Sequence, residues 1–302
     1  MPNTRLYNED GTVIKDAHTH ITKRTEEREQ EDSKYLPVIV KRQEGVTRHP
    51  DDILEHAIEE GLEQYQRTNL SLLLSAIVAG LILGFSALCL AILYKEFPMG
   101  GPEIIKRLGQ AFIYPLGFII CIMSGNQLFT EHTATAVYPL LDNRVRLKQL
   151  ALLWTLVLFG NLVGTFLSSS LMYATSSMLM VDEGFIKVYK HLTHYSFIEV
   201  LLSGILAGWL MAQGAWLLFA ATSSTTQLLC IFTVTFIIGF CGLHHSIAGS
   251  AEIFSGLMYM DSPNYIKGFS VLLSSILGNV IGGSIFVAIL NYAHIRKTQE
   301  AA

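Results

Sequence analysis

The chain has 302 residues, of which 51% are hydrophobic and 15% are charged, and its formal net charge is −4. This composition is typical of a multi-pass membrane protein and excludes an ordinary soluble domain. The negative net charge argues against a nucleic-acid partner. The four cysteines, Cys89, Cys121, Cys230 and Cys241, have no paired spacing that would indicate a disulfide framework or a zinc site.

The first part of the chain is polar. Residues 1–50 carry mixed charge with little periodicity, which predicts a largely disordered cytoplasmic tail. His18 and His20 form an HxH pattern that could bind a metal, but no further ligand lies nearby, so a solvated tail is the better interpretation. Residues 51–68 place apolar side chains at helical spacing opposite acidic ones, which predicts an amphipathic helix packed against the membrane domain.

The rest of the chain, residues 69–295, is almost entirely apolar. A membrane span needs about 20 apolar residues, and six runs satisfy this, followed by a short cytoplasmic C-terminus at residues 296–302. The second and fifth runs are too long for one crossing and are interrupted by polar residues. The expected spans are residues 69–94, 104–141, 148–175, 196–220, 227–260 and 269–294.

The six spans contain an internal duplication. Three short motifs of spans one to three recur in the same order in spans four to six, which indicates two repeats of three spans. An odd number of spans per repeat forces the second copy to insert upside down, an architecture typical of transport paths. The matching motifs are Ser75–Gly80 with Ser203–Gly208, Ser124–Gln127 with Cys241–His244, and Phe159–Gly164 with Leu277–Gly282.

Small residues also recur four positions apart within these spans. Gly160 and Gly164 form one such pair, and Gly278 and Gly282 form its counterpart in the second repeat. GxxxG spacing lets helix backbones approach closely in a membrane, so these glycines are predicted to pack helices rather than to contact a solute.

The fifth span holds the most informative stretch, Cys241–Ser250. Its centre carries His244 and His245 among small residues, inside a run that must be membrane-embedded. A break at membrane depth is tolerated only where it is buried in protein or lines a cavity, and ionisable groups there usually mark a pathway. The pattern predicts a broken helix that presents histidine to a pore.

These motifs resemble the formate/nitrite transporter family of pentameric anion channels over residues 50–297. Gly125-Asn126-Gln127-Leu128-Phe129-Thr130 is similar to the family's second-helix break, and Gly242-Leu243-His244-His245-Ser246-Ile247-Ala248 to its fifth-helix break. The resemblance implies an all-α, aquaporin-like protomer of six transmembrane helices, built as two inverted repeats with broken second and fifth helices. It also implies a lipid-embedded homopentamer in the cell (inner) membrane with both termini cytoplasmic and a pore in each protomer.

The resemblance also implies roles for individual residues. His245 takes the place of the central pore histidine, and Thr130 that of the hydroxyl residue at the second-helix break. Two apolar constrictions are expected, with Tyr114 and Phe118 on one side and Ile238 on the other. The residues themselves add further expectations. His244 is expected to be mainly structural, hydrogen-bonded across the interface between the repeats, although it is also a candidate for the solute path together with Glu131. Glu199 and Glu252 are expected to cap or bridge helices at the protomer interface.

Several positions depart from the family pattern. Leu192 stands where the family has a basic residue before the fourth helix, Gly208 where it has a pore-side asparagine, and Gly249 where an asparagine follows alanine. His244 replaces the glutamate before the central histidine, and Glu131 adds a carboxylate beside Thr130. Glu131 either faces the pore or pairs with a neighbouring group.

The resulting hypothesis is a channel, not an enzyme, that passes small monovalent anions or their conjugate weak acids and needs no cofactor. Histidine suits this task because its unperturbed pKa, about 6.5, lets it switch charge near neutral pH. One alternative keeps the fold but passes a neutral or cationic solute, because the basic residue is missing and Glu131 is added. Two remoter alternatives are a membrane metalloenzyme using Glu131, His132, His244 and His245, and a non-conducting scaffold.

Overall fold

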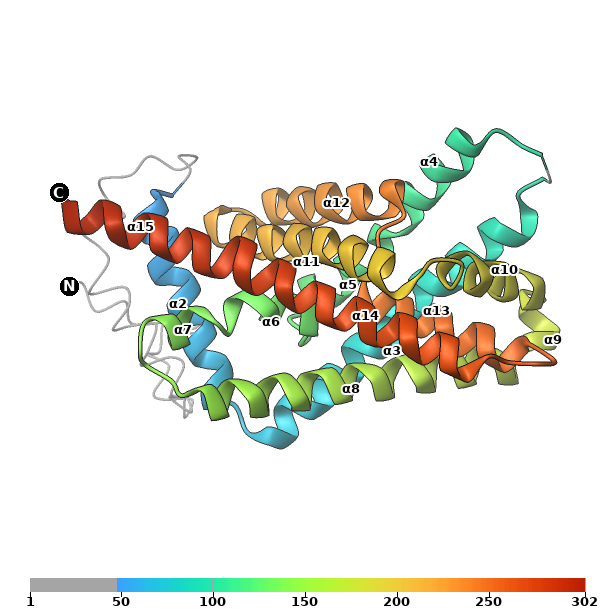
Figure 1. The fold of residues 1–302 in the computed structure, drawn as a ribbon, viewed down its shortest axis with the longest axis horizontal. Coiled ribbons are helices and arrows are strands. Elements are labelled where there is room, and N and C mark those ends of the chain that lie inside the picture. The colour runs from blue at the N-terminus through green and yellow to red at the C-terminus, as the bar shows by residue number, and fades with distance from the viewer. Residues whose placement is uncertain (1–47, 99, 302) are drawn as a thin grey trace, which may run out of the picture. The chain divides into compact units, whose positions relative to one another are not determined.

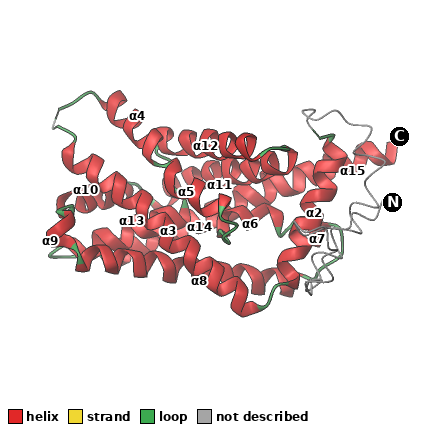
Figure 2. Ribbon diagram, turned by 180° about the vertical axis from the view of Figure 1, so that it is seen from behind, coloured by secondary structure: helices red, strands yellow, loops and turns green. Residues whose placement is uncertain are grey.

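A computed structural model describes residues 48–98 and 100–301, and every regular element in this part is a helix (Figures 1 and 2). Six helical segments are long and apolar enough to cross a membrane, as the sequence predicted. Residues 1–47, with the proposed tail and its HxH pattern, lie outside the described part. The elements are α2 (Pro50–Gln66), α3 (Asn69–Glu96), α4 (Glu103–Ile113), α5 (Pro115–Met123), α6 (Phe129–Thr135), α7 (Tyr138–Leu141), α8 (Leu147–Ala174), α9 (Ser176–Leu179), α10 (Asp182–Leu192), α11 (Phe197–Ala220), α12 (Ser224–Cys241), α13 (Ser246–Tyr259), α14 (Tyr265–Gly283), the π-helix η1 (Ser284–Ile289) and α15 (Leu290–Ala301).

The helices form two equivalent sets. The first set is α3, the broken helix α5–α6 and α8, and the second is α11, the broken helix α12–α13 and α14. Within each set the first and third helices pack along each other, α3 on α8 and α11 on α14. Each set crosses the membrane three times, so the two sets run in opposite directions, as expected for inverted repeats.

Glycines bring the paired helices together. A Cβ built on Gly164 would lie 2.9 Å from the Cα of Gly80 on α3, and one built on Gly278 would lie 2.8 Å from the Cα of Gly204 on α11. Gly160 and Gly282 meet backbone atoms of the same partner helices. No side chain fits at such distances, so glycine is required for this close approach.

The amphipathic helix α2 packs against one end of the helix bundle. It begins at Pro50, and its apolar face, including Leu54 and Ile58, is fully buried. The Tyr65 hydroxyl donates a 2.7 Å hydrogen bond to the carbonyl oxygen of Ala136, between α6 and α7. At the other end of the chain, the Arg296 guanidinium pairs with Glu55 of α2 at 2.8 Å. Both ends of the described chain therefore lie on one side, which we call the terminal side (Figure 1).

Helix α10 is an element that the sequence analysis did not predict. It connects the two repeats on the side opposite α2 and α15, which we call the α10 side (Figure 1). Phe185 and Val188 bury its apolar face, while Asp182 and Glu183 begin it and Lys190 and His191 end it, which suits the helix dipole. The helix packs on α3 and α13 and so borders the middle of the protein.

Candidate functional site

Two chain breaks meet in the middle of the bundle. In the first, residues 124–128 separate α5 from α6, and Gly125 has φ +68°. In the second, residues 242–245 separate α12 from α13, and Gly242 has φ +66°. Glycine adopts this left-handed conformation without steric cost, which lets each helix end abruptly. The backbone groups freed by the breaks then need partners, because there is no water at this depth in a bilayer.

One asparagine supplies the partners at the first break. The Asn161 side chain on α8 accepts a hydrogen bond from the Phe129 N–H at 2.8 Å. Its amide nitrogen donates to the carbonyl oxygens of Gln127 at 2.9 Å and Ala76 at 2.8 Å. Asn161 is fully buried, so this one side chain ties α3, the break and α6 together.

Asn279 on α14 does the same at the second break. It accepts from the Ser246 N–H at 2.8 Å and donates to the carbonyl oxygens of His244 at 3.1 Å and Gly204 at 2.8 Å. The serines match as well, because the Gln127 N–H donates to Ser75 Oγ and the His244 N–H donates to Ser203 Oγ. The duplication read from the sequence is therefore repeated bond for bond at the two breaks.

His245 and Thr130 join the two breaks. His245 Nε2 and Thr130 Oγ1 lie 2.8 Å apart, and both side chains are buried. The Ala248 N–H donates to His245 Nδ1 at 3.2 Å, so Nδ1 carries a lone pair and the ring proton is assigned to Nε2. His245 Nε2 then donates to the Thr130 oxygen, and the Thr130 hydroxyl hydrogen remains available as a donor.

His244 points away from this junction. Its Nε2 donates to the carbonyl oxygen of Leu192 at 3.2 Å, and its Nδ1 lies 3.0 Å from Ser203 Oγ. Since Nε2 holds the proton, Nδ1 accepts from the serine hydroxyl. Every hydrogen-bonding atom of this ring is used to fix the second break to α10 and α11. The partners belong to the second repeat and the connecting helix, so His244 does not bridge the two repeats.

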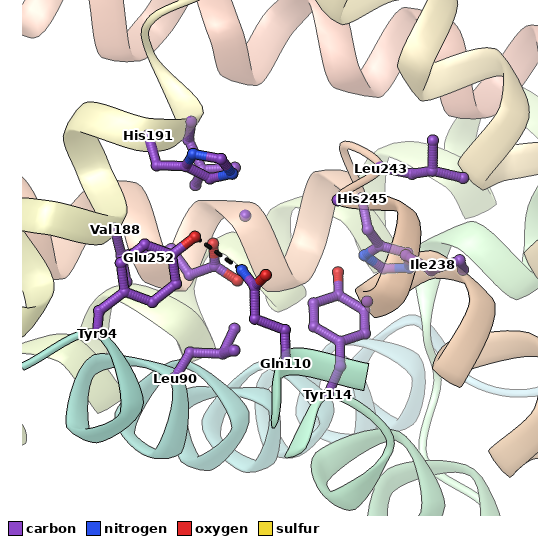
Figure 3. Close-up of a pocket in the computed structure, with 14 residues that line it drawn as sticks. Leu90, Tyr94, Gln110, Tyr114, Val188, His191, Ile238, Leu243, His245 and Glu252 are labelled. Carbon is purple, nitrogen blue, oxygen red and sulfur yellow. Dashed lines mark hydrogen bonds between the residues drawn. The ribbon is translucent and has the colours of Figure 1, made fainter. Parts of the chain in front are cut away.

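A cavity of about 40 Å³ lies on the α10 side of the junction (Figure 3). His245 lines it together with Tyr114, Ile238, Gly249 and Glu252. Tyr114 and Ile238 thus share one cavity, although the sequence analysis placed them on opposite sides of the histidine. Phe118 is fully buried, and its ring meets the His245 ring edge-on at a centroid distance of 4.9 Å. We call this space the α10-side cavity.

A second, smaller cavity lies on the terminal side, between α5, α6, α11 and α12. Glu131 lines it, with Thr235 as a further polar neighbour and apolar side chains such as Met211 and Val234 around them. The Glu131 carboxylate makes no ion pair within the part of the chain that the structure describes. Each of the two cavities is therefore lined by one carboxyl group, Glu252 in the α10-side cavity and Glu131 in the second.

Several lining residues were not expected from the sequence. Tyr94, Gln110 and His191 line the α10-side cavity, and the Gln110 amide donates to the Tyr94 hydroxyl oxygen at 2.7 Å (Figure 3). Burial lowers the pKa of the His191 imidazole, and the nearby Lys106 ammonium lowers it further. Glu252 also faces this cavity, whereas Glu199 caps α11 by accepting from the Ser196 N–H at 2.8 Å. Glu252 is the only acidic residue in the apolar segment 246–259. This was the sequence feature that could have pointed to it as a lining residue.

The departures from the family pattern have local reasons. Gly208 faces the backbone of Asn279, where a Cβ would collide, so α11 and α14 can pack only with glycine there. Leu192 supplies the carbonyl that holds His244. Gly249 lines the α10-side cavity, and a Cβ there would meet open space. Across the described residues, no group of three or more His, Cys, Asp or Glu side chains is arranged to hold a metal, so Glu131, His132, His244 and His245 form no such group.

Comparison with known proteins identifies the family. The formate/nitrite transporter family model matches residues 51–293. The chain belongs to the formate/nitrite transporter family. The chain is 32% identical to the inner membrane protein YfdC of Escherichia coli over 256 residues, 81% of this chain and 78% of YfdC. It is 26% identical to the E. coli formate channel FocA over 211 residues, 62% of this chain and 74% of FocA.

Solved structures show the same fold. A pentameric formate channel with formate bound matches with a TM-score of 0.66 and 21% identity, over 75% of this chain and 97% of that one. An ion channel of the same family matches with a TM-score of 0.71 and 19% identity, over 82% and 99%. The fold class predicted from the sequence, an all-α protein with six membrane helices, is confirmed, and the chain is a multi-pass membrane protein with a channel fold.

Proposed function

We propose that this protein conducts small monovalent anions, or their conjugate weak acids, through a path within each protomer. The observation that carries the proposal is the Thr130–His245 pair, which joins the two chain breaks at 2.8 Å, with His245 lining one cavity and Glu131, next to Thr130 in the chain, lining the other. The match to the formate/nitrite transporter family and to formate channels supports a formate- or nitrite-like solute. The pentameric neighbour supports a homopentamer. Both described ends lie on one side, and we propose that this side is cytoplasmic.

The physical problem at the junction is desolvation. An isolated carboxylate moved into an apolar medium loses far more solvation than its neutral acid does. Here the Thr130 hydroxyl, polarised by His245 Nε2–H, can donate a hydrogen bond that replaces lost water. Phe118 packs on the His245 ring and keeps the surroundings apolar. An anion is helped further when His245 is protonated, which requires Nδ1 to release the Ala248 N–H.

The proposed roles follow from these contacts. Thr130 and His245 hold the solute at the midpoint, and Tyr114, Phe118 and Ile238 form the apolar walls beside them. Glu131 faces the terminal-side cavity, where its charge state affects the entry of an anion. His244 holds the second break through Ser203 and Leu192 and does not touch the solute.

The test is uptake of labelled formate and nitrite into proteoliposomes between pH 5 and 8. We expect native flux to rise as the pH falls more steeply than the protonation of the solute alone gives, and His245→Ala to lose part of this extra dependence. Thr130→Val should lower flux at least tenfold, whereas Thr130→Ser, which keeps the hydroxyl, should retain most of it. If neither anion crosses at any pH, the proposed solute class is wrong. If T130V conducts like the native protein, the junction is not the midpoint of the path.

A further inference from the structure

Glu252 is a buried carboxyl group that neither the fold nor the proposed midpoint explains. It lies on α13, two turns after His245, and its relative exposure is 5%. It lines the α10-side cavity (Figure 3). Among the described residues, no lysine, arginine or histidine lies within ion-pairing distance of it. It does not cap a helix, because α13 is capped by His245 and ends at Tyr259.

The neighbours of Glu252 are hydrogen-bonding groups arranged around the same space. Tyr94 of α3 accepts a hydrogen bond from Gln110 of α4, so its own hydroxyl hydrogen is free to donate elsewhere. Figure 3 shows Glu252 beside this pair, with His191 of α10 across the cavity and His245 beside Tyr114 at its other end. The polar atoms are thus of mixed donor and acceptor type, as in a site built for a small polar solute.

The charged and titratable groups around Glu252 come from several elements. Helix α3 contributes Tyr94, and α4 contributes Lys106, whose ammonium lies 4.3 Å from the centre of the Tyr94 ring rather than on the carboxylate. Tyr114 follows α4, His191 belongs to α10, and His245 precedes α13. The cavity residues of α12, such as Ile238 and Gly239, do not titrate. Glu252 is therefore the only carboxyl group among the residues that line this cavity in the described structure.

The two protonation states of such a group have opposite effects on an anion. As a carboxylic acid, Glu252 has an O–H that donates to an anion in the cavity, together with the Tyr94 hydroxyl. As a carboxylate, it is an unpaired buried charge that repels the anion across a few ångströms of weakly screening protein. His245 lines the same cavity, so an anion held or rejected there is next to the junction.

We propose that Glu252 is a proton-dependent selectivity residue: its acid form admits small monovalent anions to the α10-side cavity, and its ionised form excludes them. The inference rests on the proposed function of the same path. It assigns one part of the pH dependence to the cavity, separately from the part that His245 contributes at the junction. No proton needs to leave Glu252 for this, because the acid form acts as a hydrogen-bond donor.

The experiment compares formate uptake at pH 5 to 8 for the native protein, Glu252→Gln and the matched control Glu183→Gln. The amide in E252Q would keep the shape of the side chain and a donor but could not ionise. We expect E252Q to lose the part of the fall in flux between pH 5 and 8 that neither His245 nor the protonation of the solute gives, so that its flux at pH 8 exceeds the native flux severalfold. Glu183 is exposed at the start of α10, and E183Q should follow the native profile.

The possible outcomes separate the two proposals. If E252Q follows the native pH profile while H245A does not, the role of Glu252 is wrong and the proposed function stands. If the native protein moves neither formate nor nitrite at any pH, both proposals fail. If E252Q does not assemble, infrared spectroscopy of the native protein decides: a protonated-carboxyl band that changes on adding formate, and that shifts in Glu252→Asp, supports the proposal. Absence of that band overturns it.

Discussion

The clearest structural prediction concerns Asn279, whose side chain makes three hydrogen bonds to backbone groups at the second break. Replacing it with alanine leaves the Ser246 N–H and the carbonyl oxygens of Gly204 and His244 without these partners. A protein hydrogen bond contributes about 1 kcal/mol net, and hydrogen bonds between membrane helices average about 0.6 kcal/mol. Three bonds give about 2 to 3 kcal/mol.

The expected consequence is a less stable protein with an impaired path. For a domain of this size, about 2 to 3 kcal/mol corresponds to a fall of roughly 5 to 10 °C in the melting temperature. Thermal unfolding of the detergent-solubilised protein, followed by size-exclusion chromatography, measures this directly. Formate uptake by the same preparation should fall as well, because the displaced break carries His245.

A matched control lies at the other break. Asn126 has the same side chain but only one long hydrogen bond, 3.5 Å to the Cys121 carbonyl oxygen. Asn126→Ala should lower the melting temperature by no more than about 2 °C, since it removes at most a fraction of one hydrogen bond. If N279A and N126A melt at the same temperature and transport equally, the asparagine does not hold the break and our reasoning is wrong.

Two further predictions test packing and pH dependence. Gly278→Ala places a Cβ 2.8 Å from the Gly204 Cα and should destabilise the protein by about 1 to 3 kcal/mol through overpacking. Gly249→Ala, whose Cβ meets open space, should assemble normally. Equal recovery of the two assembled variants on size-exclusion chromatography would contradict this prediction. Burial lowers the pKa of His56 on α2 below its usual 6.5, and Arg48 lowers it further. The unfolded chain therefore binds a proton at this histidine more readily than the folded protein does, and the stability of the fold decreases as the pH drops below about 6.5. His56→Gln should therefore lose less melting temperature than the native protein between pH 7.5 and pH 5, and an equal loss in both proteins would refute the assignment.

The sequence alone determined the architecture, because the constraints that set it are local. About 20 apolar residues are needed to cross a bilayer, so the six spans could be counted directly. A duplicated motif order with three spans per repeat fixes the inverted topology. The pairing of Gly160 and Gly164, and of Gly278 and Gly282, could be proposed from spacing because a membrane helix has few other ways to approach its neighbour closely.

The tertiary structure decided what each polar group in the middle contacts. His244 and His245 are adjacent in sequence, yet the His244 ring hydrogen-bonds to Ser203 and Leu192. The His245 ring instead contacts Thr130 of the opposite repeat. The family resemblance assigned the pore role to His245, but residue spacing does not give the direction of either ring, because that direction depends on how the second break is held by Asn279. Glu252 could likewise not be placed from its own segment, since the cavity it lines is completed by α3, α4 and the unforeseen helix α10. Spans follow from local hydropathy, whereas the pairing of polar side chains depends on packing between segments more than 100 residues apart.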